Sequence, residues 1–166
     1  MRNDISANYV RSIIEYDPET GILTRIRNDA SPRYRNAVPY KTGYVNAEGY
    51  VIVSIDRKPY MAHRLAYLIM TGEWPDECID HVNHDKADNR WSNIRPATLE
   101  QNCWNKKPNK RNTTGFKGVT ACGDAFKALI RINGKAIYLG RFKTVEEAGE
   151  AYRLASIAHH GEYSCA

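Results

Sequence analysis

Residues 78–105 read CIDHVNHDKADNRWSNIRPATLEQNCWN, and this stretch decides the expected fold. Residues 78–82 have the composition of a short strand, residues 83–90 form a polar loop rich in Asn and Asp, and residues 91–95 predict a second strand. Thr98, followed three residues later by Gln101, fits a capping box that opens a helix ending near Asn105. The order strand, loop, strand, helix predicts a compact ββα unit.

Three side chains of this unit suit metal-assisted chemistry: Asp80, His81 and Asn102. Neighbouring strand residues point to opposite faces, so Asp80 and His81 share a pocket only where the strand bends or ends, and the polar loop from Asn83 provides that end. A carboxylate and an amide oxygen are hard donors for Mg²⁺, and an imidazole can take a proton from water near neutral pH. Because an isolated Asp-His pair is usually structural, the surrounding pattern must carry the prediction of phosphodiester hydrolysis.

That pattern closely resembles the HNH endonucleases encoded by phages and mobile introns. The resemblance is carried by residues 80–98 and 101–105, and residues 16–21, 63–65 and 72–75 are similar to the same subfamily, so it covers most of residues 10–105. It implies that His81 activates water, while Asp80 and Asn102 hold one divalent ion, Mg²⁺ or another such as Mn²⁺. It also implies that Asn93 hydrogen-bonds loop backbone and keeps His81 in orientation.

Upstream of this unit the sequence predicts an α/β extension. Residues 5–16 fit a short amphipathic helix that ends at Asp17-Pro18, and residues 43–60 are strand-like, with a β-branched run at 50–55. A second helix is expected over residues 62–70, ending at Gly72. At its start, His63 is expected to pack or cap the helix, and Arg64 is a candidate phosphate contact.

Downstream, Asn133-Gly134 separates two segments of alternating apolar and polar residues, which is the strongest short-range hairpin signal. A two-residue turn there predicts the pairs Ile132–Lys135, Ile130–Ile137 and Ala128–Leu139. Residues 115–120 supply a first strand, and a capping box at Thr144 opens a helix to about residue 159. The expected fold is a three-stranded antiparallel sheet with one helix packed across it.

Residues 113–163 resemble an AP2 domain, a DNA-binding module of plant transcription factors that also occurs fused to phage HNH nucleases. The family binds DNA with the sheet face away from the helix, and Lys117, Arg131 and Tyr138 match its contacting positions. Gly123, Leu129 and Ala136 depart from the plant members, so their target sequence does not carry over.

The charge distribution agrees with a nucleic-acid partner. Residues 1–105 carry 13 Lys/Arg against 14 Asp/Glu, whereas residues 106–166 carry 11 against 5. A dense positive field suits a polyanion, although a basic surface kept for solubility is the alternative. The residues expected to contact DNA are Arg64, Lys106, Lys107, Lys117, Lys127, Arg131, Lys135, Tyr138 and Arg141.

The sequence therefore predicts an α+β protein with a ββα-metal HNH nuclease unit and its N-terminal α/β extension in residues 1–105, a basic linker at 106–112, and an AP2-like domain at 113–166. The expected activity is metal-dependent hydrolysis of double-stranded DNA, of homing type, leaving 5′-phosphate and 3′-hydroxyl ends. A monomer or weak dimer is expected.

No apolar run approaches the roughly 20 residues of a membrane span, and no signal peptide opens the chain. A cytoplasmic protein without a membrane partner is expected, in the host cytoplasm if a phage encodes it. Two alternatives stay open: a catalytically inactive AP2-type DNA-binding regulator, and a protein that binds structured RNA. Completeness of the set Asp80, His81, Asn93 and Asn102 favours the enzyme.

Overall fold

The computed structural model describes residues 4–26, 39–109 and 111–165. By its internal contacts the chain divides into two compact units, Met1–Leu99 and Glu100–Ala166, and each is described by itself. Mixed helix and strand content in both units agrees with the α+β class. Over the described ranges, no helix combines the length and the apolar character that crossing a membrane requires.

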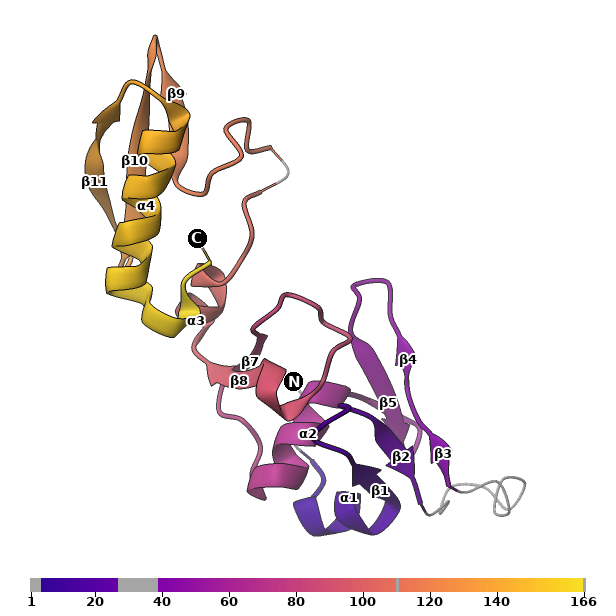
Figure 1. The fold of residues 1–166 in the computed structure, drawn as a ribbon. Coiled ribbons are helices and arrows are strands. Elements are labelled where there is room, and N and C mark those ends of the chain that lie inside the picture. Colours follow the sequence, from indigo (N-terminus) through magenta and orange to yellow (C-terminus); the bar gives the residue numbers. More distant parts are fainter. Residues whose placement is uncertain (1–3, 27–38, 110, 166) are drawn as a thin grey trace. The chain divides into compact units, whose positions relative to one another are not determined.

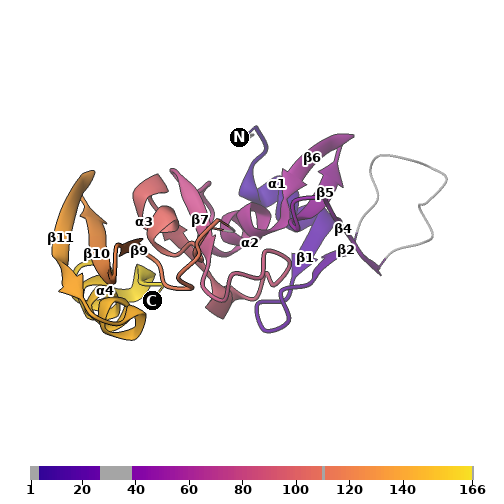
Figure 2. The ribbon, with the colours of Figure 1, turned by 90° about the horizontal axis from the view of Figure 1, so that it is seen from above.

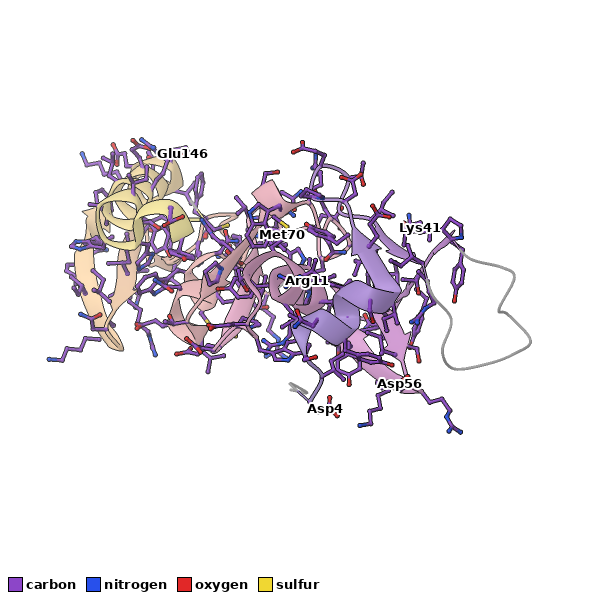
Figure 3. The ribbon with its side chains drawn as sticks, turned by 90° about the horizontal axis from the view of Figure 1, so that it is seen from below. Asp4, Arg11, Lys41, Asp56, Met70 and Glu146 are labelled. Carbon is purple, nitrogen blue, oxygen red and sulfur yellow. The ribbon has the colours of Figure 1, made fainter. Side chains whose placement is uncertain are left out.

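Two helices pack together in the N-terminal unit. The first, α1 (Ala7–Ile13), begins at Ser6, whose side chain accepts a hydrogen bond from the Tyr9 amide. The second, α2 (Ala62–Thr71), ends at Gly72, as expected. The Arg11 guanidinium of α1 donates to the Ile69 carbonyl of α2 at 2.6 Å and 3.0 Å. Figure 3 labels Arg11 and, close to it, Met70, which lies near the end of α2.

The expected helix over residues 5–16 is too long. Residues Ile14–Tyr16 instead form strand β1, which pairs antiparallel with β2 (Leu23–Arg25). The side chains of Ile14 and Tyr16 are buried while Glu15 is exposed, and this alternation has the period of a strand. Cross-strand pairing therefore overrides the helical pattern that continues from α1.

Short antiparallel strands make up the rest of this unit (Figures 1 and 2). The sheet order is β1-β2-β3 in one sheet, β4-β5-β6 in the second and β7-β8 in the third. The remaining bounds are β3 (Tyr40–Lys41), β4 (Tyr44–Val45), β5 (Val51–Ile55), β6 (Lys58–Met61), β7 (Cys78–His81) and β8 (Ile94–Ala97). The second strand of the ββα unit was expected at 91–95, but Trp91–Asn93 forms a 3-10 turn and the strand starts at Ile94.

The core of the N-terminal unit lies between the two helices and these strands. Val10, Val53 and Leu65 have no solvent exposure, and residues of α1, β5 and α2 belong to the same buried cluster. Ile79 of β7 and Ile94 of β8 extend this cluster to the ββα strands. The two strands that carry the predicted active-site motif are thus fixed to the main core.

The C-terminal unit contains the predicted sheet and helix. Its strands β9 (Val119–Cys122), β10 (Ala125–Ile132) and β11 (Lys135–Phe142) form one antiparallel sheet in the order β11-β10-β9. Helix α4 (Val145–His160) lies across this sheet (Figure 1), and its N-terminus has the expected capping box between Thr144 and Glu147. A 3-10 turn (Gly161–Tyr163) follows it, and α3 (Leu99–Trp104) precedes the sheet.

The hairpin register confirms two of the three expected pairs. Ile132 pairs with Lys135 and Ile130 with Ile137, around a turn in which Asn133 and Gly134 both have positive φ. The pair Ala128–Leu139 is wrong, because a bulge beyond Leu129 brings Ala128 opposite Gly140. Gly140 has a φ of +141°, a conformation that suits glycine, so it permits the bulge.

The first strand of this sheet starts later than expected. Residues 115–118 form turns and only Val119–Cys122 is extended, instead of 115–120. Gly118 has a φ of +71°, and a Cβ there would collide with the Tyr152 ring and the Leu129 carbonyl. The turn therefore requires glycine, and it brings the chain into the sheet close beneath α4.

Candidate active site and DNA-binding face

Asp80 and His81 lie at the end of β7, and both are buried, with 4% and 6% of their surface exposed. The Asp80 carboxylate faces its cross-strand partner Arg95, whose Nε and Nη2 donate to Oδ2 at 3.0 Å and 2.8 Å. A buried carboxylate needs such a counter-charge, because an unpaired charge in the interior is strongly unfavourable. A buried carboxylate thus lies beside His81, and Arg95 is the cation that pairs with it.

His81 is enclosed by other groups. Its ring stands perpendicular to that of His63, with 5.0 Å between ring centroids, and its Nε2 lies 3.5 Å from the Oδ1 of Asn89. Burial lowers the pKa of His81, while the contact with Asn89 and the charges of Asp80 and neighbouring acids act in the opposite direction. The imidazole is therefore unprotonated at neutral pH, which is the state a general base requires.

Asn93 holds the polar loop between the two strands. Its Oδ1 accepts from the Asn83 amide at 2.9 Å, and its Nδ2 donates to the Asp88 carbonyl at 2.7 Å. Its own carbonyl accepts from the Val82 amide at 2.9 Å, directly after His81. These contacts are the loop-backbone bonds expected of this residue, and they fix the chain that follows His81.

Aspartates of the same loop cap its backbone. Asp85 Oδ1 accepts from the Ala87 amide at 2.9 Å, and Asp88 accepts from both the backbone and the guanidinium of Arg90. The hydrogen bonds with Arg90 lower the pKa of Asp88 to about 2. Both side chains therefore act in loop structure.

The predicted second metal donor, Asn102, lies on α3 in the C-terminal unit. Its pairing with Asp80 stays a prediction. Among the described residues, no group of three or more His, Cys, Asp or Glu is placed to hold a metal ion. The expected donor set is one carboxylate and one amide, and Mg²⁺ in phosphoryl-transfer sites takes few protein ligands and keeps several waters.

The C-terminal sheet presents a basic face opposite α4. Cross-strand partners share a face, so the pairs Lys127–Arg141, Leu129–Tyr138 and Arg131–Ala136 lie together. Helix α4 covers the other face, where Val119, Ala128 and Ile130 are buried. We call the set Lys127, Arg131, Tyr138 and Arg141 the basic face.

The bulge decides the membership of this face. In an unbroken register Arg141 would share the side of Ile137 and Leu139, because strand side chains alternate. With the bulge it stands opposite Lys127 instead. Lys135 pairs with Ile132 at the end of the hairpin, on the α4 side, so it does not belong to the basic face.

Two of the cations expected to contact DNA are used inside the protein. Arg64 is only 4% exposed, and it donates to the carbonyls of Glu77 at 2.8 Å and Pro75 at 3.2 Å. The Lys117 ammonium donates to the carbonyls of Trp104 at 2.5 Å and Lys106 at 2.8 Å, which closes the C-terminal end of α3. Both side chains already donate to backbone carbonyls of this chain, whereas Lys106 and Lys107 have exposed side chains.

Further contacts join α3 to the rest of the C-terminal unit. Trp104 stacks on His160 of α4, with 4.3 Å between centroids and 7° between ring planes. Glu100 accepts from the Gly134 amide of the hairpin turn at 3.3 Å. The helix that carries Asn102 is therefore held by α4, by the hairpin and by Lys117.

Four residues around the site were not predicted: Tyr50, His63, Asn89 and Arg95. Arg95 had a usable signal, since a β-hairpin register places it opposite Asp80. Asn89 lies in the quoted loop but was not singled out. Tyr50 and His63 come from distant segments, and only the folded core brings their rings near His81.

Comparisons with known proteins point to one family. Residues 60–103 match a family model described as HNH endonuclease. An uncharacterized HNH endonuclease of Acanthamoeba polyphaga mimivirus is 32% identical over 123 residues, which span 73% of this chain and 64% of the relative. The chain thus covers less than two thirds of that relative's length. No solved structure matches the chain.

Proposed function

We propose that this protein is a divalent-metal-dependent endonuclease that hydrolyses phosphodiester bonds of duplex DNA. The observation that carries the proposal is His81, a buried and unprotonated imidazole beside Asp80 at a strand end, within a segment that matches an HNH endonuclease model. The proposal assigns His81 as general base and Asn93 as the residue that fixes the loop after it.

The metal would be held by Asp80 and Asn102. Their carboxylate and amide oxygens fit a hard cation such as Mg²⁺ or Mn²⁺. The buried Asp80 charge is paired with the Arg95 guanidinium, so an ion bound to this carboxylate would have to take the place of that guanidinium. When bound, the ion would stabilise negative charge developing on the phosphate and the leaving oxygen.

The chain's own contribution is to activate water. The His81 imidazole accepts a proton from a water molecule as that water's oxygen bonds to phosphorus and the bond to the 3′ oxygen breaks. The departing 3′ oxygen takes a proton from solvent, so cleavage leaves 5′-phosphate and 3′-hydroxyl ends. General-base catalysis of this kind contributes about 10²–10⁴-fold in rate.

The basic face of the C-terminal unit would bind the duplex, as the resemblance to AP2 domains suggests. Lys127, Arg131 and Arg141 supply positive charge, and Tyr138, 60% exposed, lies among them. A two-stranded ribbon can enter the major groove, where side chains read base edges. Lys106 and Lys107, in the same unit, would add phosphate contacts.

One observation favours the inactive DNA-binding regulator. Arg95 already neutralises Asp80, and a permanently paired carboxylate would not take a metal ion. The nuclease requires that a metal ion takes the place of the Arg95 guanidinium at Asp80, whereas the regulator keeps the ion pair.

Incubation with supercoiled plasmid in Mg²⁺, in Mn²⁺ and in EDTA tests the proposed function. The enzyme would relax the plasmid in at least one metal and not in EDTA. Binding of duplex in gel shifts without cleavage in either metal would establish the regulator instead, and cleavage or retention of structured RNA alone would contradict both.

A further inference from the structure

Two aromatic rings from outside the HNH motif enclose the His81 ring. His63, in the first turn of α2, stands at 86° to it with 5.0 Å between centroids. Tyr50, just before β5, lies 6.1 Å from His81 and 5.4 Å from His63. All three distances fall within the range in which aromatic rings interact favourably.

His63 is an unusual choice for this position if packing alone matters. It is 6% exposed, and its Nδ1 is buried without a hydrogen-bond partner among the described residues. Buried polar atoms are nearly always paired, and an aliphatic side chain such as Leu would fill the space without an unpaired nitrogen. The aromatic ring at this position therefore points to a role in its contact with His81.

The electrostatic state of His63 suits such a contact. Burial, together with the neighbouring His81 and Arg64, lowers the pKa of His63 to about 3. The ring is uncharged at neutral pH, so it places no positive charge beside the proposed base. The His63 ring therefore contacts His81 through edge-to-face packing of two uncharged rings.

Tyr50 is in turn held by the loop that follows His81. The Lys86 ammonium lies 4.5 Å from the centroid of the Tyr50 ring and donates to the Glu48 carbonyl at 3.1 Å. On the other side of the site, Asn89 lies beside His81 Nε2 and donates to the Ala87 carbonyl at 3.1 Å. The His81 ring is thus surrounded by groups that are themselves fixed.

We propose that His63 and Tyr50 are positioning residues that hold the His81 imidazole in the orientation needed to deprotonate water. This inference rests on the proposed function. Neither residue touches DNA or the attacking water in this proposal, and each acts through its ring contact with His81. Displacing a reacting group by about 1 Å can cost about 100-fold in rate, so loss of the enclosing ring should slow cleavage by about 10–100-fold.

Three substitutions test the role of the His63 ring. His63→Leu fills the volume without a ring, and His63→Phe keeps a flat ring without nitrogens. Leu68→Ala is the matched control, because Leu68 is 1% exposed on the same helix and its aliphatic side chain offers no ring to His81. Single-turnover cleavage and duplex affinity are measured for each folded variant, and the His81 ring signals are followed by ¹H–¹⁵N NMR, assigned by their loss in His81→Ala.

The proposal predicts a split between the variants. His63→Leu should cleave about 10–100-fold more slowly at unchanged DNA affinity and shift the His81 signals, whereas His63→Phe should stay within about 5-fold of wild type. Leu68→Ala should lower stability and leave the rate and the His81 signals unchanged. Tyr50→Leu against Tyr50→Phe should repeat the pattern in a second, more exposed residue if the His63 variants do not fold.

Equal rates in His63→Leu and wild type would overturn the proposal, as would equal losses in His63→Leu and Leu68→Ala. If wild type cleaves no DNA, the proposed function fails. The NMR comparison then still decides whether His63 positions the ring, because unmoved His81 signals in His63→Leu would reject it.

Discussion

Acid should destabilise the N-terminal unit through His63, and this effect can be calculated. The pKa of His63 lies at about 3 in the folded protein against an ordinary value of 6.5. When the chain unfolds, the ring regains its ordinary pKa, so between these values the unfolded state binds a proton that the folded state does not. The free energy of unfolding must therefore fall as the pH drops through this window.

The size of the effect follows from the two pKa values. From pH 8 to pH 5, His63 should remove about 2 kcal/mol of stability, and close to pH 3 the loss approaches about 5 kcal/mol. The pKa of His81 is also lowered by burial, so it adds to the loss in the same direction. The contribution of His63 is therefore obtained by comparing the pH dependence of the free energy of unfolding in wild type and in a His63 variant.

Urea unfolding at pH 8 and pH 5 measures this difference, with NMR signals of core residues such as Val53 and Leu65 reporting on the N-terminal unit. His63→Phe cannot titrate, so its stability should change by about 2 kcal/mol less than that of wild type between the two pH values. His159→Gln, which removes an exposed histidine of α4, is the control. Equal pH dependence in wild type and His63→Phe would refute a buried, uncharged His63.

Three further substitutions probe the Lys117 hydrogen bonds, the Arg95–Asp80 ion pair and the basic face. Lys117→Met should destabilise the C-terminal unit by about 1–3 kcal/mol in urea, because it leaves the carbonyls at the end of α3 unpaired, whereas the exposed Lys107→Met should not. Arg95→Met should lower the free energy of unfolding by about 3–5 kcal/mol in EDTA, because it removes the counter-charge of Asp80. Mg²⁺ should restore part of that stability. An identical thermal midpoint of this variant with and without Mg²⁺ would argue against a metal at Asp80. Arg131→Ala should weaken duplex binding by about 1–3 kcal/mol in gel shifts if the side chain reads a base edge, and a smaller loss at every sequence would assign it to phosphate.

Local signals in the sequence predicted most of the fold. The Asn133-Gly134 turn and the Thr144 capping box both occur where expected, because each depends on a few neighbouring residues. The strand Ile14–Tyr16 and the bulge at Gly140 were missed, because both depend on the partner strand. The bulge decides which cations share a face of the sheet, since it moves Arg141 onto the basic face.

The motif residues of the site could be named from the sequence, but their surroundings could not. A count of basic residues does not tell which side chains donate hydrogen bonds inside the protein. Arg64 and Lys117 were therefore expected to contact DNA, and the structure shows that both donate to backbone carbonyls. Linker composition suggested a boundary at 106–112, yet α3 is bonded to Lys117 and stacks on His160. A truncation at residue 112 would remove Lys117, Gly134 and His160, which all contact that helix.

The central claim is that His81 is the base of a metal-dependent nuclease, and single-turnover cleavage of end-labelled duplex by wild type and His81→Ala tests it most directly. Both proteins are first matched for duplex affinity, so that only the chemical step differs. The account predicts that wild type in Mg²⁺ or Mn²⁺ yields 5′-phosphate and 3′-hydroxyl ends and that His81→Ala cleaves about 10²–10⁴-fold more slowly. Equal cleavage by the two proteins, or none by wild type in either metal, would contradict it.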